Sequence, residues 1–149
     1  MDPPTDCALY RFDLAAKSAH KIPGSDGLSF GVLAPEGRHL AAVEVATRRI
    51  FLVDLLSGQR TQLTRSHREA ASPIWSEDSQ YVYFNDLMSP EPAIFRVYVR
   101  DAREEKVTDV SFTTEGGLGF WSGLAPDGSP LLLRNQERSD VYVLSLAPP

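Results

Sequence analysis

Cysteine, long apolar runs and an excess of positive charge are all missing from this sequence of 149 residues. The single cysteine, Cys7, excludes an internal disulfide and any multi-cysteine metal site. No apolar run approaches the roughly 18 residues that cross a bilayer, so we expect no membrane span. Lysine and arginine total 15 against 20 acidic residues, and the net charge of −5 argues against a broad nucleic-acid surface.

A sustained helical period is also absent, so we expect little helix. The apolar residues occur instead in short runs that are rich in β-branched and aromatic side chains. Turn residues bound these runs, which is typical of strands. Three clear examples are residues 50–54, 80–84 and 140–144.

The chain contains an internal repeat. Three segments are similar, 33–38, 75–80 and 124–129, and each opens with an apolar residue that is followed by another seven positions later. This spacing predicts the pairs Leu33 with Leu40, Trp75 with Val82, and Leu124 with Leu131. A second column lies 18 to 20 positions after the first and contains Phe51, Phe95 and Tyr142, with Tyr10 in the same column near the start. Twelve positions after Tyr10, Phe51 and Phe95 come Ile22, Leu63 and Val107.

These columns predict an all-β fold made of four-stranded antiparallel blades of a β-propeller. The four strands of a blade are called a to d in chain order, so that the b–c connection joins the second strand to the third and the d–a connection joins one blade to the next. The unit repeats every 41 to 49 residues, which matches a propeller blade. A sandwich would not repeat its columns, and a β-helix would repeat at a shorter interval. We expect strands c and d of a first blade at 8–22, complete blades at 28–64 and 71–108, and strands a, b and c of a last blade at 118–146.

About three blades plus extra strands make an incomplete ring, because a closed propeller takes roughly four to eight blades. Two explanations are open at this stage. The chain could be the C-terminal part of a larger bacterial protein, which we favour, or two chains could associate to complete the ring.

Two motifs resemble those of the TolB-like (PD40) propellers, distant relatives of WD40 repeats. Segments similar to Ser-Pro-Asp-Gly occur at 34–37, 76–79 and 125–128, although the middle one lacks both Pro and Gly. Strands similar to Tyr-Val-x-Asp-Leu occur at 9–14, 50–55 and 141–146. The resemblance covers nearly the whole chain. It implies an interaction scaffold, with the periplasm favoured as its compartment, and it leaves the ligand open.

Catalytic and metal-binding patterns are not found. The serine in Gly119–Gly123 is one position too late for the Gly-x-Ser-x-Gly elbow. His20, His39 and His67 have no metal-ligand spacing, and we expect His20 and His39 to be solvated. The acidic pairs at 77–78 and 104–105 are expected to be solvated turn residues. We therefore predict no catalytic residue, no metal and no cofactor.

Four aromatic residues are expected to pack between blades, with a stacking platform as the alternative: Phe30, Trp75, Phe95 and Trp121. Gly31, Pro73 and Ser122 share a repeat position where we expect the innermost strands to approach closely.

The binding face is predicted from loop length. In an antiparallel meander, the b–c and d–a connections share one face, and the longest insertions, 85–93 and 109–117, both fall there. Long loops in compact domains are commonly functional. Candidate binding residues on this face are Arg48, Arg65, His67, Arg68, Arg134 and Arg138. Carboxylates are interspersed among them, so an ordinary mixed surface remains the alternative.

The sequence therefore predicts a non-enzymatic propeller module for binding or sensing. Its partner would be a protein or a small polar ligand on the b–c and d–a loop face, and not nucleic acid. The alternative is the accessory propeller of a larger enzyme, such as an S9-type peptidase.

Overall fold

The computed structural model describes residues 7–86, 89–110 and 120–133. Within these ranges the chain forms twelve strands and no helix, which confirms the all-β expectation. The part of the chain that the structure describes therefore has no helix long and apolar enough to cross a membrane.

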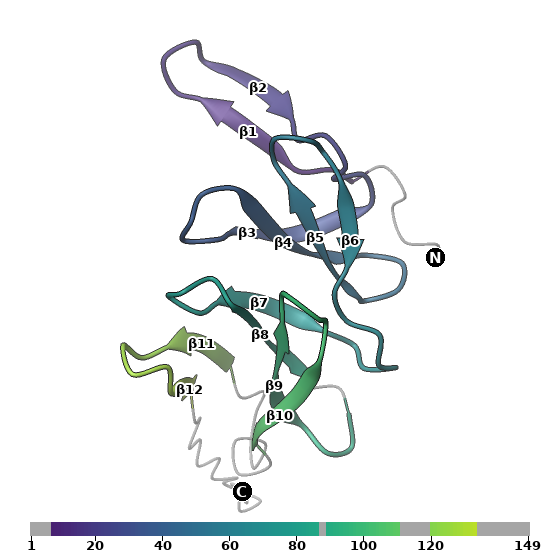
Figure 1. The fold of residues 1–149 in the computed structure, drawn as a ribbon, viewed down its shortest axis with the longest axis vertical. Helices are drawn as coiled ribbons and strands as arrows, with labels where there is room; N and C mark the ends of the chain where they lie inside the picture. Colours follow the sequence, from purple (N-terminus) through teal and green to yellow (C-terminus); the bar gives the residue numbers. More distant parts are fainter. Residues whose placement is uncertain (1–6, 87–88, 111–119, 134–149) are drawn as a thin grey trace, which may run out of the picture.

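The described strands form four antiparallel sheets that follow one another along the molecule without closing into a ring (Figure 1). Two sheets have four strands each, in sequential order, and they confirm the predicted blade architecture. We call them the first blade, β3 (Leu28–Leu33), β4 (His39–Glu44), β5 (Ile50–Asp54) and β6 (Arg60–Gln62), and the second blade, β7 (Ala71–Trp75), β8 (Tyr81–Asp86), β9 (Ala93–Tyr98) and β10 (Glu104–Asp109).

A two-stranded sheet lies on either side of the two blades. The N-terminal one contains β1 (Tyr10–Asp13) and β2 (Ser18–Lys21), and the C-terminal one contains β11 (Phe120–Leu124) and β12 (Pro130–Leu133). The strand predicted at 140–144 lies outside the described residues.

The predicted column of cross-strand pairs is present in both blades. Leu33 pairs with Leu40, and Trp75 pairs with Val82. In the C-terminal hairpin the prediction is wrong by one residue, because Leu124 pairs with Pro130 and Gly123 pairs with Leu131. The turn is one residue shorter there: the N–H of Ala125 bonds to the carbonyl of Ser129, four residues on, whereas the N–H of Ala34 bonds to His39, five residues on.

The turns between the first two strands of the two blades and of the C-terminal hairpin each use a residue with positive φ. Gly37 and Gly128 have φ of +80° and +82°, a region that glycine enters without steric cost. The second blade has Ser79 at the equivalent position with φ of +58°. Its hydroxyl oxygen accepts a hydrogen bond from the N–H of Glu36 in the first blade, so this strained residue also joins the two blades.

The innermost strand of each unit contains a β-bulge. The register shifts between Ser29 and Val32 in β3 and between Ala71 and Ile74 in β7. A Cβ atom at Gly31 would lie 2.5 Å from Leu9 Cδ1, which accounts for the glycine at this close approach.

The bulge also explains why one prediction for the aromatic residues is wrong. Phe30 has φ of +51° and is 67% exposed, so it does not pack between blades. A bulge adds an unpaired residue and redirects the side chains on either side of it. Phe95 and Trp75 are buried as expected, and the Trp121 side chain lies outside the described ones.

The main core lies at the seam between the two blades. Trp75 is 7% exposed and packs in one cluster with Val43 and Ile50 of the first blade and Val82 and Phe84 of the second. Its indole N–H donates to the carbonyl oxygen of Val32 across the seam at 2.9 Å. Strand β7 of the second blade therefore packs directly against β3 and β4 of the first blade.

We predict that Trp75→Ala lowers the free energy of unfolding by about 3–5 kcal/mol, as large-to-small core truncations do. Trp75→Phe keeps most of the apolar contact but removes the donor to Val32, so a loss of about 1–2 kcal/mol is expected. Chemical denaturation of the two variants measures both values. A loss below about 1 kcal/mol for Trp75→Ala would show that the seam does not depend on this side chain.

Candidate functional site

The b–c and d–a connections meet on one face, as the meander topology requires. The N–H of Val45, in the b–c turn of the first blade, bonds to the carbonyl of Gly27 in the preceding d–a link at 2.9 Å. The N–H of Ala70, at the end of the next d–a link, bonds to the carbonyl of Arg48 at 3.0 Å. We call this the connection face. It includes the link between the two blades, which is formed by residues 63–70.

A pocket of about 460 Å³ opens on the connection face. One wall is the blade-to-blade link and the other is the b–c connection of the second blade, and the lining residues are Ser66, His67, Arg68, Glu69, Asp86, Ser89 and Pro90. The pocket therefore contains two of the predicted binding residues, His67 and Arg68.

Arg68 is held in place by two contacts. Its guanidinium carbon lies 4.0 Å from the centre of the Phe95 ring, and Nη1 lies 4.0 Å from Oδ2 of Asp86. The side chain is 41% exposed, so one side packs on the blade while the other side faces the pocket. The guanidinium thus has a fixed position at the pocket wall.

Asp86 is the buried carboxylate of this pocket, with its side chain 6% exposed. Burial raises its pKa above the ordinary value, and the nearby Arg68 acts in the opposite direction. Only the carboxylate of this pair is buried, and the partly exposed Arg68 guanidinium is its nearby opposite charge.

Glu104 fixes the link from the other side, a role that the sequence did not reveal. Its Oε1 accepts hydrogen bonds from the N–H groups of Arg65 and Ser66 at 2.7 and 3.0 Å, and its Oε2 accepts one from the Ser66 hydroxyl. Burial opposes ionisation of this carboxyl, but the hydrogen bonds from Ser66 and Arg65 lower its pKa overall. The expectation that Glu104 is a merely solvated turn residue is wrong.

The side chains of Arg65 and His67 are exposed and, within the described residues, have no hydrogen bond or ion pair. Arg48 is half-buried in the b–c turn with φ of +55°. The structure thus brings Arg48, Arg65, His67 and Arg68 to the connection face. Arg134, Arg138 and most of the 109–117 insertion lie outside the described residues.

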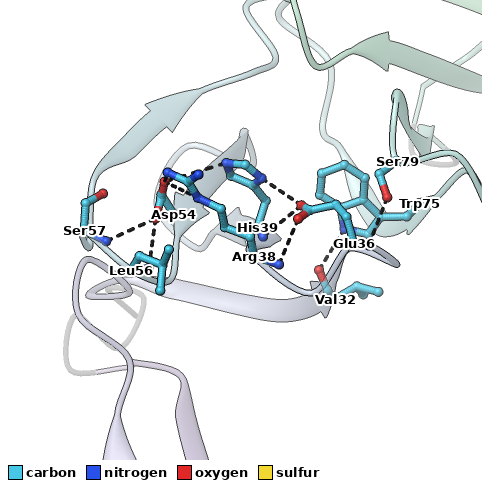
Figure 2. Close-up of polar contacts among 9 residues, drawn as sticks. All are labelled: Val32, Glu36, Arg38, His39, Asp54, Leu56, Ser57, Trp75 and Ser79. Carbon is cyan, nitrogen blue, oxygen red and sulfur yellow. Dashed lines mark hydrogen bonds and ion pairs between the residues drawn. The ribbon is translucent and has the colours of Figure 1, made fainter.

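The opposite face carries a charged network that sequence reasoning missed (Figure 2). Glu36 accepts hydrogen bonds from Nδ1 and the N–H of His39 at 2.7 and 3.0 Å, and from the N–H of Arg38 at 3.0 Å. Arg38 in turn donates through Nε and Nη2 to Oδ2 of Asp54. His39 is therefore hydrogen-bonded to a carboxylate and is not simply solvated. The Glu–x–x–His spacing in a tight turn was the available signal.

Asp54 also organises the turn between the third and fourth strands. Its Oδ1 accepts hydrogen bonds from the N–H groups of Leu56 and Ser57 at 2.8 and 3.1 Å. The hydrogen bond from Arg38 and those from these two amides hold the pKa of Asp54 well below its usual range. The hydrogen bonds of Glu36 and Asp54 either close their own turns or join neighbouring turns, which indicates a structural role.

Groups of three His, Cys, Asp or Glu side chains placed to hold a metal ion do not occur in residues 7–86, 89–110 and 120–133.

Comparison with curated proteins identifies relatives that are longer than this chain. The Tol-Pal system protein TolB of Desulfotalea psychrophila is 25% identical over 126 residues, which are 84% of this chain and 26% of that protein. An uncharacterized protein of Agrobacterium fabrum is 32% identical over 63 residues, 42% of this chain and 22% of that protein. The chain therefore spans about a quarter of the length of these relatives. No protein-family model matches it.

Solved structures extend the likeness to the fold. TolB from Acinetobacter baumannii matches 89% of this chain and 33% of its own, with a TM-score of 0.64 and 20% identity. A candidate TolB from Agrobacterium tumefaciens matches 72% of this chain and 39% of its own, with a TM-score of 0.59 and 22% identity. The chain has a TolB-like β-propeller fold.

The TolB-like fold is shared with an enzyme. A prolyl endopeptidase matches 85% of this chain and 23% of its own, with a TM-score of 0.59 and 17% identity. Identity at this level shows the fold alone, and the function must be argued from the surface.

We predict that Glu104→Ala lowers the free energy of unfolding by about 1–2 kcal/mol near pH 7, because two backbone N–H groups lose a charged acceptor. The pKa of Glu104 is lowered in the folded state, so its contribution is complete above the ordinary glutamate pKa and is lost as the pH falls through the folded-state value.

Denaturation of the wild type and of Glu104→Ala between pH 7 and pH 3 checks this prediction. The difference between them should shrink as the pH falls. A constant difference would contradict the assigned role of the carboxylate, and Glu91→Ala, with an exposed carboxyl nearby, is the control.

Proposed function

We propose that this chain is part of a non-enzymatic binding module whose partner is an acidic segment of another protein, held on the connection face. The observation that carries the proposal is the pocket between the link residues Ser66–Glu69 and the residues Asp86, Ser89 and Pro90. The exposed side chain of His67 is part of its lining, and the exposed side chain of Arg65 belongs to the same link.

The link that presents these side chains is fixed before any partner arrives. Glu104 holds the backbone of Arg65 and Ser66, and Phe95 with Asp86 holds the side chain of Arg68. A preorganised surface loses less conformational entropy on binding. Arg65 and His67 can then use their hydrogen-bond donors for a partner, because no described residue occupies them.

The choice of an acidic partner follows from the chemistry of these donors. An arginine guanidinium can bind a carboxylate through two parallel hydrogen bonds. Glu69 and Asp86 also line the pocket, so a partner with a few well-placed carboxylates fits better than one of uniformly high negative charge. The likeness to TolB, a protein of the Tol-Pal system, supports a role in protein interaction.

A second candidate is the accessory propeller of a larger enzyme, such as an S9-type peptidase. The fold likeness to a prolyl endopeptidase favours it. In that case the propeller would control access to a catalytic domain, and such a domain would be encoded in the same gene. Its presence there would distinguish the two candidates.

The test is a titration of the full ¹⁵N-labelled chain with the capped acidic peptide Glu-Asp-Glu-Glu, followed by NMR. Chemical-shift changes should centre on residues 65–69 and on Asp86 and Ser89. Replacing both Arg65 and His67 by alanine should weaken binding by about three- to tenfold at low salt, and less at about 0.15 M salt, where exposed charges are screened.

Arg100→Ala is the matched control, because Arg100 is also exposed but lies in the c–d turn of the second blade. It should leave binding unchanged. Equal binding by the wild type and the double variant, or shift changes centred on Glu36 and His39, would refute the proposed surface.

A further inference from the structure

The seams on the two sides of the second blade differ in chemistry although the repeat is the same. We call the seam between the two blades the first seam, and the seam between the second blade and the C-terminal hairpin the second seam. At the first seam, positions 39, 41 and 52 of the first blade are His, Ala and Leu, and Ala41 and Leu52 pack with Trp75 in the core. The equivalent positions of the second blade, at the same register on β8 and β9, are Tyr81, Tyr83 and Arg96. The face that the second blade turns toward β11 and β12 is therefore aromatic and polar.

These side chains form a connected cluster. The rings of Tyr81 and Tyr98 have centroids 4.3 Å apart, and the guanidinium of Arg96 lies 4.5 Å from the Tyr81 centroid. Arg96 also donates to the Tyr83 hydroxyl at 3.2 Å and forms an ion pair with Glu105. The tyrosine rings are thus held rigidly by the blade that carries them.

The second seam contains a groove of about 690 Å³ between this face and the C-terminal hairpin. Its apolar walls come from Ile74, Tyr81 and Tyr83 on one side and from Leu124 and Pro126 on the other. At the first seam the corresponding space is filled by the Trp75 side chain, which is buried against Val32. Figure 1 shows the hairpin of β11 and β12 beside the second blade.

The rim of the groove is acidic. Glu77, Asp78 and Asp127 line it and are exposed, and none of the described residues that line it is a lysine or an arginine. A hydrogen bond from the Ser76 hydroxyl and one from the N–H of Gln80 lower the pKa of Asp78, and the N–H of Ser129 lowers that of Asp127. Glu77 has no side-chain hydrogen bond or ion pair within the described residues, so it can pair with a partner.

We propose that this groove binds an extended peptide segment of a partner protein in which leucine or valine side chains alternate with lysine or arginine. The apolar side chains would occupy the walls formed by Tyr83, Ile74 and Leu124, and the cationic ones would pair with Glu77 and Asp127. Rigid aromatic side chains supply contact area at low entropic cost, which is why tyrosine is frequent in peptide-binding surfaces.

An extended segment suits this groove because two turns flank it, 76–79 and 125–128. It is formed by the a–b turns, on the face opposite the connection face. The inference therefore stands apart from the proposed binding of an acidic segment.

The probe is the capped peptide Gly-Leu-Lys-Val-Arg-Leu-Gly, titrated into the full ¹⁵N-labelled chain. Shift changes should centre on Ile74, Tyr81, Tyr83 and Leu124. Two control peptides separate the contributions: one with Glu in place of Lys and Arg, and one with Ser in place of the apolar residues. Both should bind at least about tenfold more weakly, since each removes one of the two kinds of contact.

Glu77→Lys should weaken binding of the basic peptide by about tenfold, because it replaces an attraction with a repulsion at an exposed site where no described contact is lost. Glu69→Lys makes the same change in net charge on the connection face and should have no such effect.

Three results would overturn the inference: no binding of the basic peptide, equal weakening by Glu77→Lys and Glu69→Lys, or shift changes outside the groove. The acidic-peptide titration is unaffected by any of them, so the two proposals can fail separately.

Discussion

The hydrogen bond from the Trp75 indole to the Val32 carbonyl, with the apolar contacts around it, is the constraint on which the described structure depends. Each neighbouring blade covers only one face of a four-stranded sheet. A blade therefore needs the next blade to bury its other face. Trp75 supplies the largest side chain at this seam and also satisfies a carbonyl at the edge of the bulge in β3. The hydrogen bond from the Glu36 N–H to Ser79 adds a second connection at the turn end of the seam.

The seam also determines where ligands can bind. Because Trp75 fills its interior, a ligand can reach this seam at its two ends. At one end, the link of residues 63–70 is fixed by Glu104, Phe95 and Asp86 and presents Arg65 and His67. At the next seam, Tyr83 and Arg96 stand where the first blade has Ala41 and Leu52, and a groove is present. The differences between repeats therefore carry more functional information than the features that the repeats share.

Sequence reasoning succeeded where a pattern was repeated and failed where a single local contact decided the outcome. The seven-residue spacing predicted the pairs Leu33–Leu40 and Trp75–Val82, because two cross-strand neighbours joined by similar turns must keep the same separation. The same spacing was misleading at Leu124, where the shorter turn moves the partner to Pro130. The exposure of Phe30 could not be read from composition, since it depends on a bulge in β3.

The candidate site was predictable only in part. The meander topology placed Arg48, Arg65, His67 and Arg68 on one face, and the backbone contacts between the connections agree with that placement. The hydrogen bonds of Glu104 join residues almost 40 positions apart in the chain, and a single sequence has no signal for such a contact. The mixed charge of the pocket was visible in the sequence, but the burial of Asp86 was not.

Native-state hydrogen exchange tests most directly whether the seam joins the two blades into one cooperative unit. The amides of Ala42 and Val53 report on the first blade, and those of Phe84 and Val97 report on the second, since all four residues are fully buried. The account predicts that both groups exchange with the same free energy, equal to that of global unfolding, and that Trp75→Phe lowers both equally. Exchange of one blade at a distinctly lower free energy, or a loss confined to one blade in the variant, would contradict it.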